Sequence, residues 1–261
     1  MKISVVIPQK IRIFISRILI KDLENFYIFD TSTLSRYSSN SKINNIYLAA
    51  IERSEDKEFD TVYKKLKLTS LYQFVEQILD KGIEGDFVEC GCWNGNSTIG
   101  ISELIKTKSK SERKFYIFDS FEGLSDFTEK DITQDIGNKE QEELKIHFTS
   151  SYEKVKKRLS SYKFVRIYKG WIPAIFEKAK ISSSKFAFVH IDVDLYEPTL
   201  ESIKYFFPRL KSGGVLVCDD YGSEIFPGAS EAINNYLKTI SVDDILLKIE
   251  GAAGGIAIFK K

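Results

Sequence analysis

The sequence has few cysteines and no excess of charge of either sign. Three cysteines, Cys90, Cys92 and Cys218, occur in 261 residues, and each falls in or next to an apolar segment. Their number and spacing exclude a disulfide framework and match no zinc motif, so we interpret them as small core residues rather than redox or metal groups. The 38 basic and 37 acidic side chains leave a net charge of +1. This balance excludes a general electrostatic attraction to nucleic acid or to an acidic membrane.

The sequence also lacks a long uncharged hydrophobic run. Segment 3–20 is rich in isoleucine, but Lys10, Arg12 and Arg17 interrupt it, whereas a membrane-spanning helix needs about 20 mainly apolar residues. The segment has no small-residue cleavage site of the kind that ends a signal peptide. We therefore predict a cytoplasmic protein without a transmembrane segment. Three interpretations of this segment stay open: a cover for the main domain, a contact in a homo-oligomer, or an element lying on a membrane surface.

Beyond the first 70 residues, strand-like and helix-like segments alternate along the chain. Short apolar runs predict five strands, at 87–88, 114–118, 164–168, 186–191 and 215–218, and a terminal hairpin at 245–249 and 256–259. The alternation predicts an α/β fold with a doubly wound, mostly parallel, seven-stranded sheet. We divide the chain into a mainly helical N-terminal extension, 1–70, and a main domain, 71–261.

The first predicted strand ends in a glycine turn that is typical of a cofactor site. Gly91 and Gly95 lie four positions apart, and Ser97 suits the start of a helix. Gly91 allows a ligand close to the backbone, and Glu89 offers a carboxylate to an amino or sulfonium group. A dinucleotide site requires G-x-G-x-x-G and a turn free of acids, so the pattern favours S-adenosylmethionine over a nicotinamide cofactor. A turn without a ligand is the remaining alternative.

Asp119 follows the second predicted strand. A carboxylate roughly 20–30 residues past a glycine turn, at this position, commonly accepts both ribose hydroxyls of a cofactor. The alternative is an aspartate that only forms a turn. Segment 125–150 is polar and has no clear periodicity, so we predict a mobile lid there.

Pairs of acids follow the fourth and fifth predicted strands. These are Asp192 with Asp194, and Asp219 with Asp220. Neighbouring parallel strands bring their carboxyl ends to one edge of the sheet, where several carboxylates would repel one another without a cation among them. Oxygen ligands favour Mg²⁺ or another hard divalent cation. The alternative is that the acids cap the helices that follow.

Four motifs in order resemble the macrocin O-methyltransferase (TylF-like) family. They are Val88-Glu89-Cys90-Gly91-x-x-x-Gly95-x-Ser97, Asp119-Ser120-Phe121-Glu122-Gly123-Leu124, Asp192-x-Asp194-x-Tyr196-Glu197-x-Thr199, and Gly213-Gly214 followed by Asp219-Asp220-Tyr221-Gly222. The resemblance covers about residues 70–261. Its members use S-adenosylmethionine and Mg²⁺ to methylate sugar hydroxyls of natural products. Two positions depart from the family pattern: Ser125 replaces the usual proline, and 171–174 lacks an acid.

The resemblance implies a role for each matching residue. The methionine part of the cofactor would contact the glycine-turn residues Glu89, Gly91, Gly95 and Ser97. Asp119 would bind the ribose, with Ser120 and Phe121 near the nucleoside.

For the reaction itself, the resemblance implies that Asp192, Asp219 and Asp220 bind Mg²⁺. Asp194 would accept the proton of the acceptor hydroxyl, and Asp192 and His190 are the rival bases. His190 lies in an apolar strand, which favours a core role for it.

The acceptor would be a small molecule that carries a sugar, or a nucleotide-sugar. We keep two alternatives: a non-catalytic nucleotide-binding or scaffold protein with this fold, and a nicotinamide-dependent dehydrogenase. Nucleic-acid methylation is disfavoured, because the chain has no basic surplus and no base-flipping motif.

Overall fold

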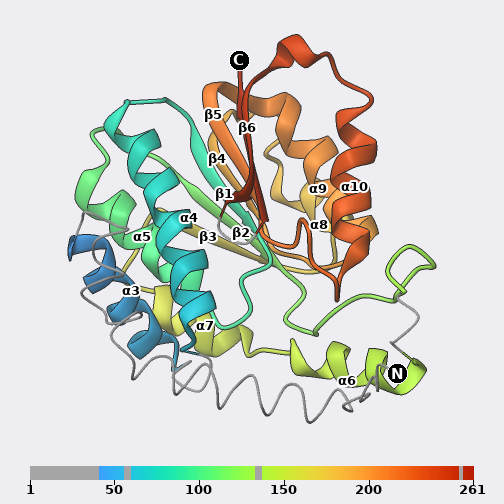
Figure 1. The fold of residues 1–261 in the computed structure, drawn as a ribbon. Helices are drawn as coiled ribbons and strands as arrows, with labels where there is room; N and C mark the ends of the chain where they lie inside the picture. Colours follow the sequence, from blue (N-terminus) through green and yellow to red (C-terminus); the bar gives the residue numbers. More distant parts are fainter. Residues whose placement is uncertain (1–40, 56–59, 133–136, 253–254) are drawn as a thin grey trace, which may run out of the picture.

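A seven-stranded sheet with helices on both faces forms the centre of the protein (Figure 1). The computed structural model describes residues 41–55, 60–132, 137–252 and 255–261. Its strands are β1 (Asp86–Cys90), β2 (Phe115–Asp119), β3 (Val165–Lys169), β4 (Phe186–Ile191), β5 (Leu210–Cys218), β6 (Ile245–Ala252) and β7 (Gly255–Lys260). They lie in the order β3-β2-β1-β4-β5-β7-β6. The first five strands are mutually parallel, and β7 pairs antiparallel with β5 and β6. The predicted fold class and terminal hairpin are confirmed.

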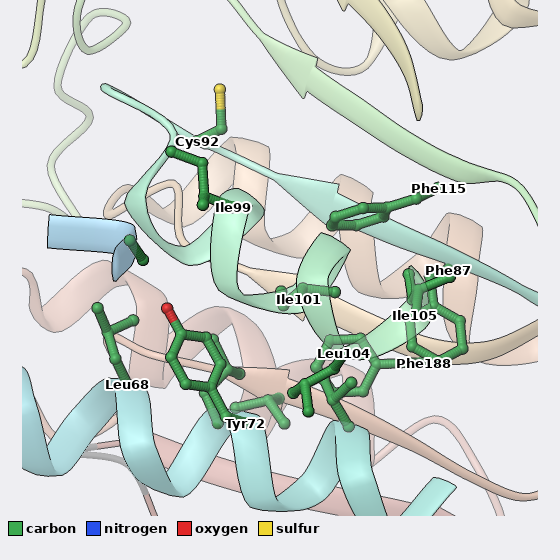
Figure 2. Close-up of a cluster of buried hydrophobic side chains, with 14 of the residues drawn as sticks. Leu68, Tyr72, Phe87, Cys92, Ile99, Ile101, Leu104, Ile105, Phe115 and Phe188 are labelled. Carbon is green, nitrogen blue, oxygen red and sulfur yellow. The ribbon is translucent and has the colours of Figure 1, made fainter. Parts of the chain in front are cut away.

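The central strands are apolar throughout because both faces of the sheet are covered. Alternate residues of a strand point to opposite faces. Phe87 and Phe188 therefore belong to one hydrophobic core, while their neighbours Val88 and Val189 belong to the other. Figure 2 shows part of the first core, which combines phenylalanines of the strands with Leu68, Tyr72 and Leu104 of two helices.

Each face of the sheet carries its own set of helices. On one face, α3 (Ser41–Ser54), α4 (Val62–Asp80), α5 (Asn96–Lys108) and α7 (Tyr152–Leu159) contribute to the first core. The other core receives residues of α8 (Ala174–Ala179), α9 (Tyr196–Phe206), η2 (Phe207–Arg209) and α10 (Pro227–Leu237). The other helices in the described part of the chain are α6 (Asn138–His147) and η3 (Val242–Asp244). Among the helices described, none combines the length and apolar character needed to cross a bilayer.

The described part of the predicted N-terminal extension is helical. The predicted division at residue 70 falls inside α4, which begins after its N-cap Thr61. The isoleucine-rich segment 3–20 lies outside the described residues, so its predicted roles stay predictions.

The segment predicted as a lid contains a regular helix, α6. Its sequence is polar on nearly every side, so it shows no apolar stripe that would predict a helix. Good helix formers and short-range ion pairs support it instead, for example Lys145 with Glu142 at 2.9 Å. Asp131 lies in the first part of the same segment, and its carboxylate is buried. It accepts hydrogen bonds from Thr128 N (2.9 Å) and from Tyr196 N (2.6 Å), at the start of α9. This part of the segment is therefore attached to the domain.

Candidate active site

The sheet itself positions the predicted acids at its carboxyl edge. Asp192 N donates to the Cys90 carbonyl oxygen at 2.8 Å, and Asp219 N donates to that of Ile191 at 3.0 Å. These bonds continue the parallel hydrogen-bond pattern one residue past β4 and β5. The acids therefore begin at fixed places beside the glycine turn that follows β1.

Gly91 allows the ends of β1 and β4 to approach closely. Its φ is +83°, and a Cβ atom there would lie 1.8 Å from the carbonyl oxygen of Asp192. Only a residue without a side chain fits both constraints. The glycine turn and the first acid pair are thus packed backbone against backbone.

A cavity of about 1230 Å³ lies over this edge of the sheet. Eight of the predicted site residues line it: Gly91, Ser97, Asp119, Ser120, Asp192, Asp194, Asp219 and Asp220. Three predicted cofactor residues, Glu89, Gly95 and Phe121, are not among its described lining residues. The structure therefore brings the acid pairs and most of the predicted cofactor residues to one space.

The carboxylate of Asp119 organises two of the loops around the cavity. One oxygen accepts hydrogen bonds from Cys92 N (2.7 Å) and Trp93 N (2.9 Å), and the other accepts one from Phe121 N (2.6 Å). These bonds connect the glycine turn to the loop after β2. The predicted ribose contact stays a prediction; in this structure the side chain holds the turn itself.

Glu89 is fully buried and faces polar side chains beneath the cavity. Its carboxylate accepts a short hydrogen bond from the Thr98 hydroxyl, and one of its oxygens lies 2.9 Å from His190 Nδ1. His190 Nε2 lies 3.1 Å from Asp219 Oδ2. His190, on β4, therefore connects Glu89 of β1 to Asp219, which follows β5. An isolated core histidine would not have this role.

Charge interactions shift the pKa values in this network in opposite directions. Burial would lower the pKa of His190, but the carboxylates of Asp219 and Glu89 outweigh burial and raise it well above its usual value. Burial would raise the pKa of Asp219, but Lys67 and His190 outweigh burial and lower it.

The pKa values of two further buried acids, Asp194 and Asp220, are raised. Burial, followed by repulsion from Asp220 and Asp192, raises the pKa of Asp194 well above its usual value. Burial and then Asp192 raise the pKa of Asp220 to about 7. Burial and the neighbouring carboxylates therefore both disfavour the charged forms of Asp194 and Asp220.

Three side chains at this edge of the sheet offer ligand atoms of the kind that a divalent cation binds. Ligand atoms of His190, Asp192 and Asp219 lie within 4.8 Å of one another. Asp219 Oδ1 is buried and makes no hydrogen bond within the described part of the chain, so it has a lone pair to offer. The acids fit a hard cation. This group contains His190 where the prediction has Asp220, and all three predicted ligands, Asp192, Asp219 and Asp220, stay predictions.

Lys67 is a site residue that the sequence reasoning missed. Its ammonium nitrogen lies 2.9 Å from Asp219 Oδ2 and 3.6 Å from Asp192 Oδ1. One signal in the sequence could have revealed it: Lys67 shares a helical face with the apolar Leu71 and Ile78, at spacings of four and eleven. A cation on the buried face of a helix suggests a partner inside the protein.

Aromatic side chains that the sequence reasoning did not assign also line the cavity. The ring centroid of Trp93, in the glycine turn, lies 5.8 Å from that of His147 and 6.1 Å from that of Phe148, at the end of α6. Phe148 lies 6.2 Å from Phe226, before α10. Ring contacts thus join the end of the lid segment to the glycine turn and to the loop before α10.

Comparison with known proteins identifies the family. The sequence model described as macrocin O-methyltransferase (TylF) matches residues 55–257. The chain belongs to the macrocin O-methyltransferase family. It is therefore an S-adenosylmethionine-dependent O-methyltransferase, as predicted, and neither the dehydrogenase nor the non-catalytic alternative is favoured.

Two curated relatives are O-methyltransferases from Streptomyces olivaceus and Micromonospora griseorubida. The chain is 27% identical over 194 residues, 71% of its length and 70% of the relative's, to 8-demethyl-8-(2,3-dimethoxy-alpha-L-rhamnosyl)-tetracenomycin-C 4'-O-methyltransferase of Streptomyces olivaceus. It is 27% identical over 207 residues, 76% of its length and 80% of the relative's, to mycinamicin III 3''-O-methyltransferase of Micromonospora griseorubida.

Solved structures agree with the fold. The O-methyltransferase NovP superposes with a TM-score of 0.59 and 23% identity, covering 76% of this chain and 80% of that one. The calicheamicin methyltransferase CalS11 superposes with a TM-score of 0.61 and 17% identity, covering 85% and 93%. At these identities, the likeness concerns the fold alone.

Proposed function

We propose that this macrocin O-methyltransferase family member methylates a hydroxyl of a sugar on a small molecule, and that a divalent cation, Mg²⁺ or a similar ion, assists the reaction. The observation that carries the proposal is that the glycine turn and both acid pairs line one cavity. The relatives support a glycosylated acceptor, because they are named as methyltransferases of a rhamnosyl tetracenomycin and of mycinamicin III.

In the proposed arrangement, the cofactor lies along the glycine turn. Gly91 and Ser97 line the cavity at the turn, and Ser120 lines it from the loop after β2. S-adenosylmethionine supplies a methyl group that is already activated as a sulfonium. The chain therefore needs mainly to align the acceptor and to remove a proton.

Asp192, Asp219 and Asp220 would hold the cation, which when bound lowers the pKa of an acceptor hydroxyl. Asp194 lines the same cavity, and its backbone N–H donates to Asp220 Oδ2 at 3.1 Å. We propose Asp194 as the group that accepts the hydroxyl proton, with Asp192 as the alternative. His190 is fully buried and is not a described lining residue of the cavity, so it suits a positioning role.

Glu89 would act on the cofactor through the turn rather than by direct contact. Its two carboxylate oxygens face Thr98 and His190. Replacement of Glu89 by glutamine would therefore disturb the start of α5 and, through His190, Asp219. If Glu89 instead contacted the cofactor directly, as the resemblance implies, the same replacement would weaken cofactor binding alone.

Calorimetric titration tests the proposal. S-adenosylhomocysteine is titrated into the purified protein with and without Mg²⁺, with NAD as the control ligand. We expect micromolar binding of S-adenosylhomocysteine and no binding of NAD. The Asp192→Asn variant should keep S-adenosylhomocysteine binding and lose the response to Mg²⁺. Unchanged Mg²⁺ binding in this variant would remove Asp192 from the site.

Methyl transfer assays then separate the acceptor classes. A panel of glycosylated natural products and a panel of nucleotide-sugars are incubated with the enzyme and labelled S-adenosylmethionine. Among the described residues, seven acids and two lysines line the cavity. This excess of acids favours neutral glycosides over diphosphate-bearing nucleotide-sugars. Turnover of nucleotide-sugars alone would reverse this assignment.

A further inference from the structure

Lys67 reaches the acidic cluster from a separate element, α4. The ammonium group lies within ion-pair distance of two carboxylates, 2.9 Å from Asp219 Oδ2 and 3.6 Å from Asp192 Oδ1. The Lys67 side chain is 19% exposed, and that of Asp219 is fully buried. Its position is therefore enclosed by the cluster and is not that of a freely solvated surface lysine.

The ammonium group and a divalent cation would compete for the same oxygens. Mg²⁺ binds carboxylate oxygens at about 2.0–2.1 Å and keeps a strict octahedral shell. A cation coordinated by both Asp192 and Asp219 would lie close to the place that the Lys67 nitrogen occupies. Two positive centres at such a short separation repel strongly in a buried site.

Lys67 can leave the cluster without unfolding the helix that carries it. Its side chain lines the 1230 Å³ cavity, and a lysine has a flexible four-carbon stem with no fixed geometry at the nitrogen. The neighbouring acid Asp219 keeps its second partner, His190, at 3.1 Å when the ammonium moves away. The movement therefore exchanges one cation for another at an otherwise fixed site.

We propose that Lys67 is an internal counter-ion of the acidic cluster, which a divalent cation must displace, so that Lys67 sets the cation concentration at which the enzyme is loaded. This inference rests on the proposed function, because it requires that the cluster binds a divalent cation. It assigns Lys67 as a positioning residue: the ammonium holds Asp192 and Asp219 together in the metal-free protein.

The test measures cation binding directly rather than turnover. Mg²⁺ and, separately, Mn²⁺ are titrated calorimetrically into metal-stripped wild-type protein and into Lys67→Met, Lys67→Gln and Lys67→Arg. Lys65→Met is the matched control: Lys65 lies two positions away on α4, and its ammonium lies over the Tyr47 ring. This control removes one positive charge from the same helix and leaves the acidic cluster unchanged.

We expect both neutral Lys67 variants to bind Mg²⁺ about tenfold more tightly or better, because the competing charge is gone. The Mg²⁺ affinities of Lys67→Arg and Lys65→Met should stay within about threefold of the wild-type affinity, which is clearly smaller than the expected tenfold change. Thermal unfolding supplies a second readout. Without metal, Lys67→Met and Lys67→Gln should melt below wild type, and saturating Mg²⁺ should raise their midpoints by more than it raises that of wild type.

Each failure has its own meaning. If wild type binds Mg²⁺ and both neutral variants bind it equally or more weakly, the counter-ion inference is overturned and the proposed cation site stands. If no protein of the set binds Mg²⁺ or Mn²⁺ while S-adenosylhomocysteine still binds, the cation part of the proposed function fails, and this inference fails with it. The glutamine variant keeps the test decisive if the methionine variant does not fold.

Discussion

Replacing Gly91 by alanine would place a methyl group between the glycine turn and the first acid pair. The new Cβ atom would lie 1.8 Å from the Asp192 carbonyl oxygen and 2.7 Å from its carbonyl carbon, where an ordinary contact begins at 3.4 Å. Both obstructing atoms belong to the backbone, so no side-chain rotation can relieve the overlap. Either the turn or the end of β4 must move.

Two separable terms give the expected size of the effect. A residue with a Cβ at φ +83° costs about 1–2 kcal/mol relative to glycine. Overpacking against a rigid neighbour adds about 1–3 kcal/mol or more. The free energy of unfolding of Gly91→Ala should therefore fall by about 2–5 kcal/mol. Because a domain typically has about 5–15 kcal/mol of stability, the variant should still fold and can be titrated.

Gly82→Ala is the control that isolates the backbone term. Gly82 also has a positive φ, +66°, but a Cβ there would meet no atom within 4 Å. Urea denaturation of both variants measures the two free energies of unfolding, and calorimetry measures S-adenosylhomocysteine and Mg²⁺ binding. The free energy of unfolding of Gly82→Ala should fall by about 1–2 kcal/mol, and its ligand binding should be unchanged. Gly91→Ala should lose both stability and ligand binding. Equal destabilisation of the two variants would refute the close approach of β1 and β4.

Two further predictions concern the lid segment and the acidic cluster. Asp131→Ala leaves the Thr128 and Tyr196 N–H groups without their buried carboxylate partner, so urea denaturation should show a loss of about 2–4 kcal/mol. The exposed Glu129 provides the control Glu129→Ala, and similar losses in both variants would contradict the anchoring role of Asp131. Mg²⁺ affinity should fall as the pH is lowered below about 7, because a proton on Asp220, whose pKa is raised to about 7, must leave before the cation binds. The same pKa shift makes the stability of the metal-free protein depend on pH. The pKa of Asp220 is about 3.9 in the unfolded chain, so its contribution to the free energy of unfolding is present below about pH 4 and is lost as the pH rises towards 7. Calorimetric Mg²⁺ titrations at pH 6 and pH 8 check the affinity, with Asp220→Asn as the control, and a pH-independent wild-type affinity would exclude Asp220 as a ligand.

Much of the fold could be read from local patterns. Fully apolar strands such as 186–191, separated by helical segments, indicated a sheet covered on both faces, and the seven-stranded arrangement agrees. α6 was missed because charged pairs and helix propensity support it, and neither produces an apolar stripe. The site was predicted in outline because acids at the ends of parallel strands must share one edge.

Sequence alone determined which residues to propose for the chemistry: the glycine turn after β1, Asp119, and the acids after β4 and β5. Their order along the chain was sufficient to indicate the family, because each motif is local. Only the tertiary structure decided how these residues are used. It placed Glu89 under the cavity beside His190, made Asp119 a support of the glycine turn, and brought Lys67 from α4 to the acids. These contacts join residues that are between 27 and 152 positions apart in the sequence. Tertiary packing brings such residues together, and no local sequence pattern encodes it.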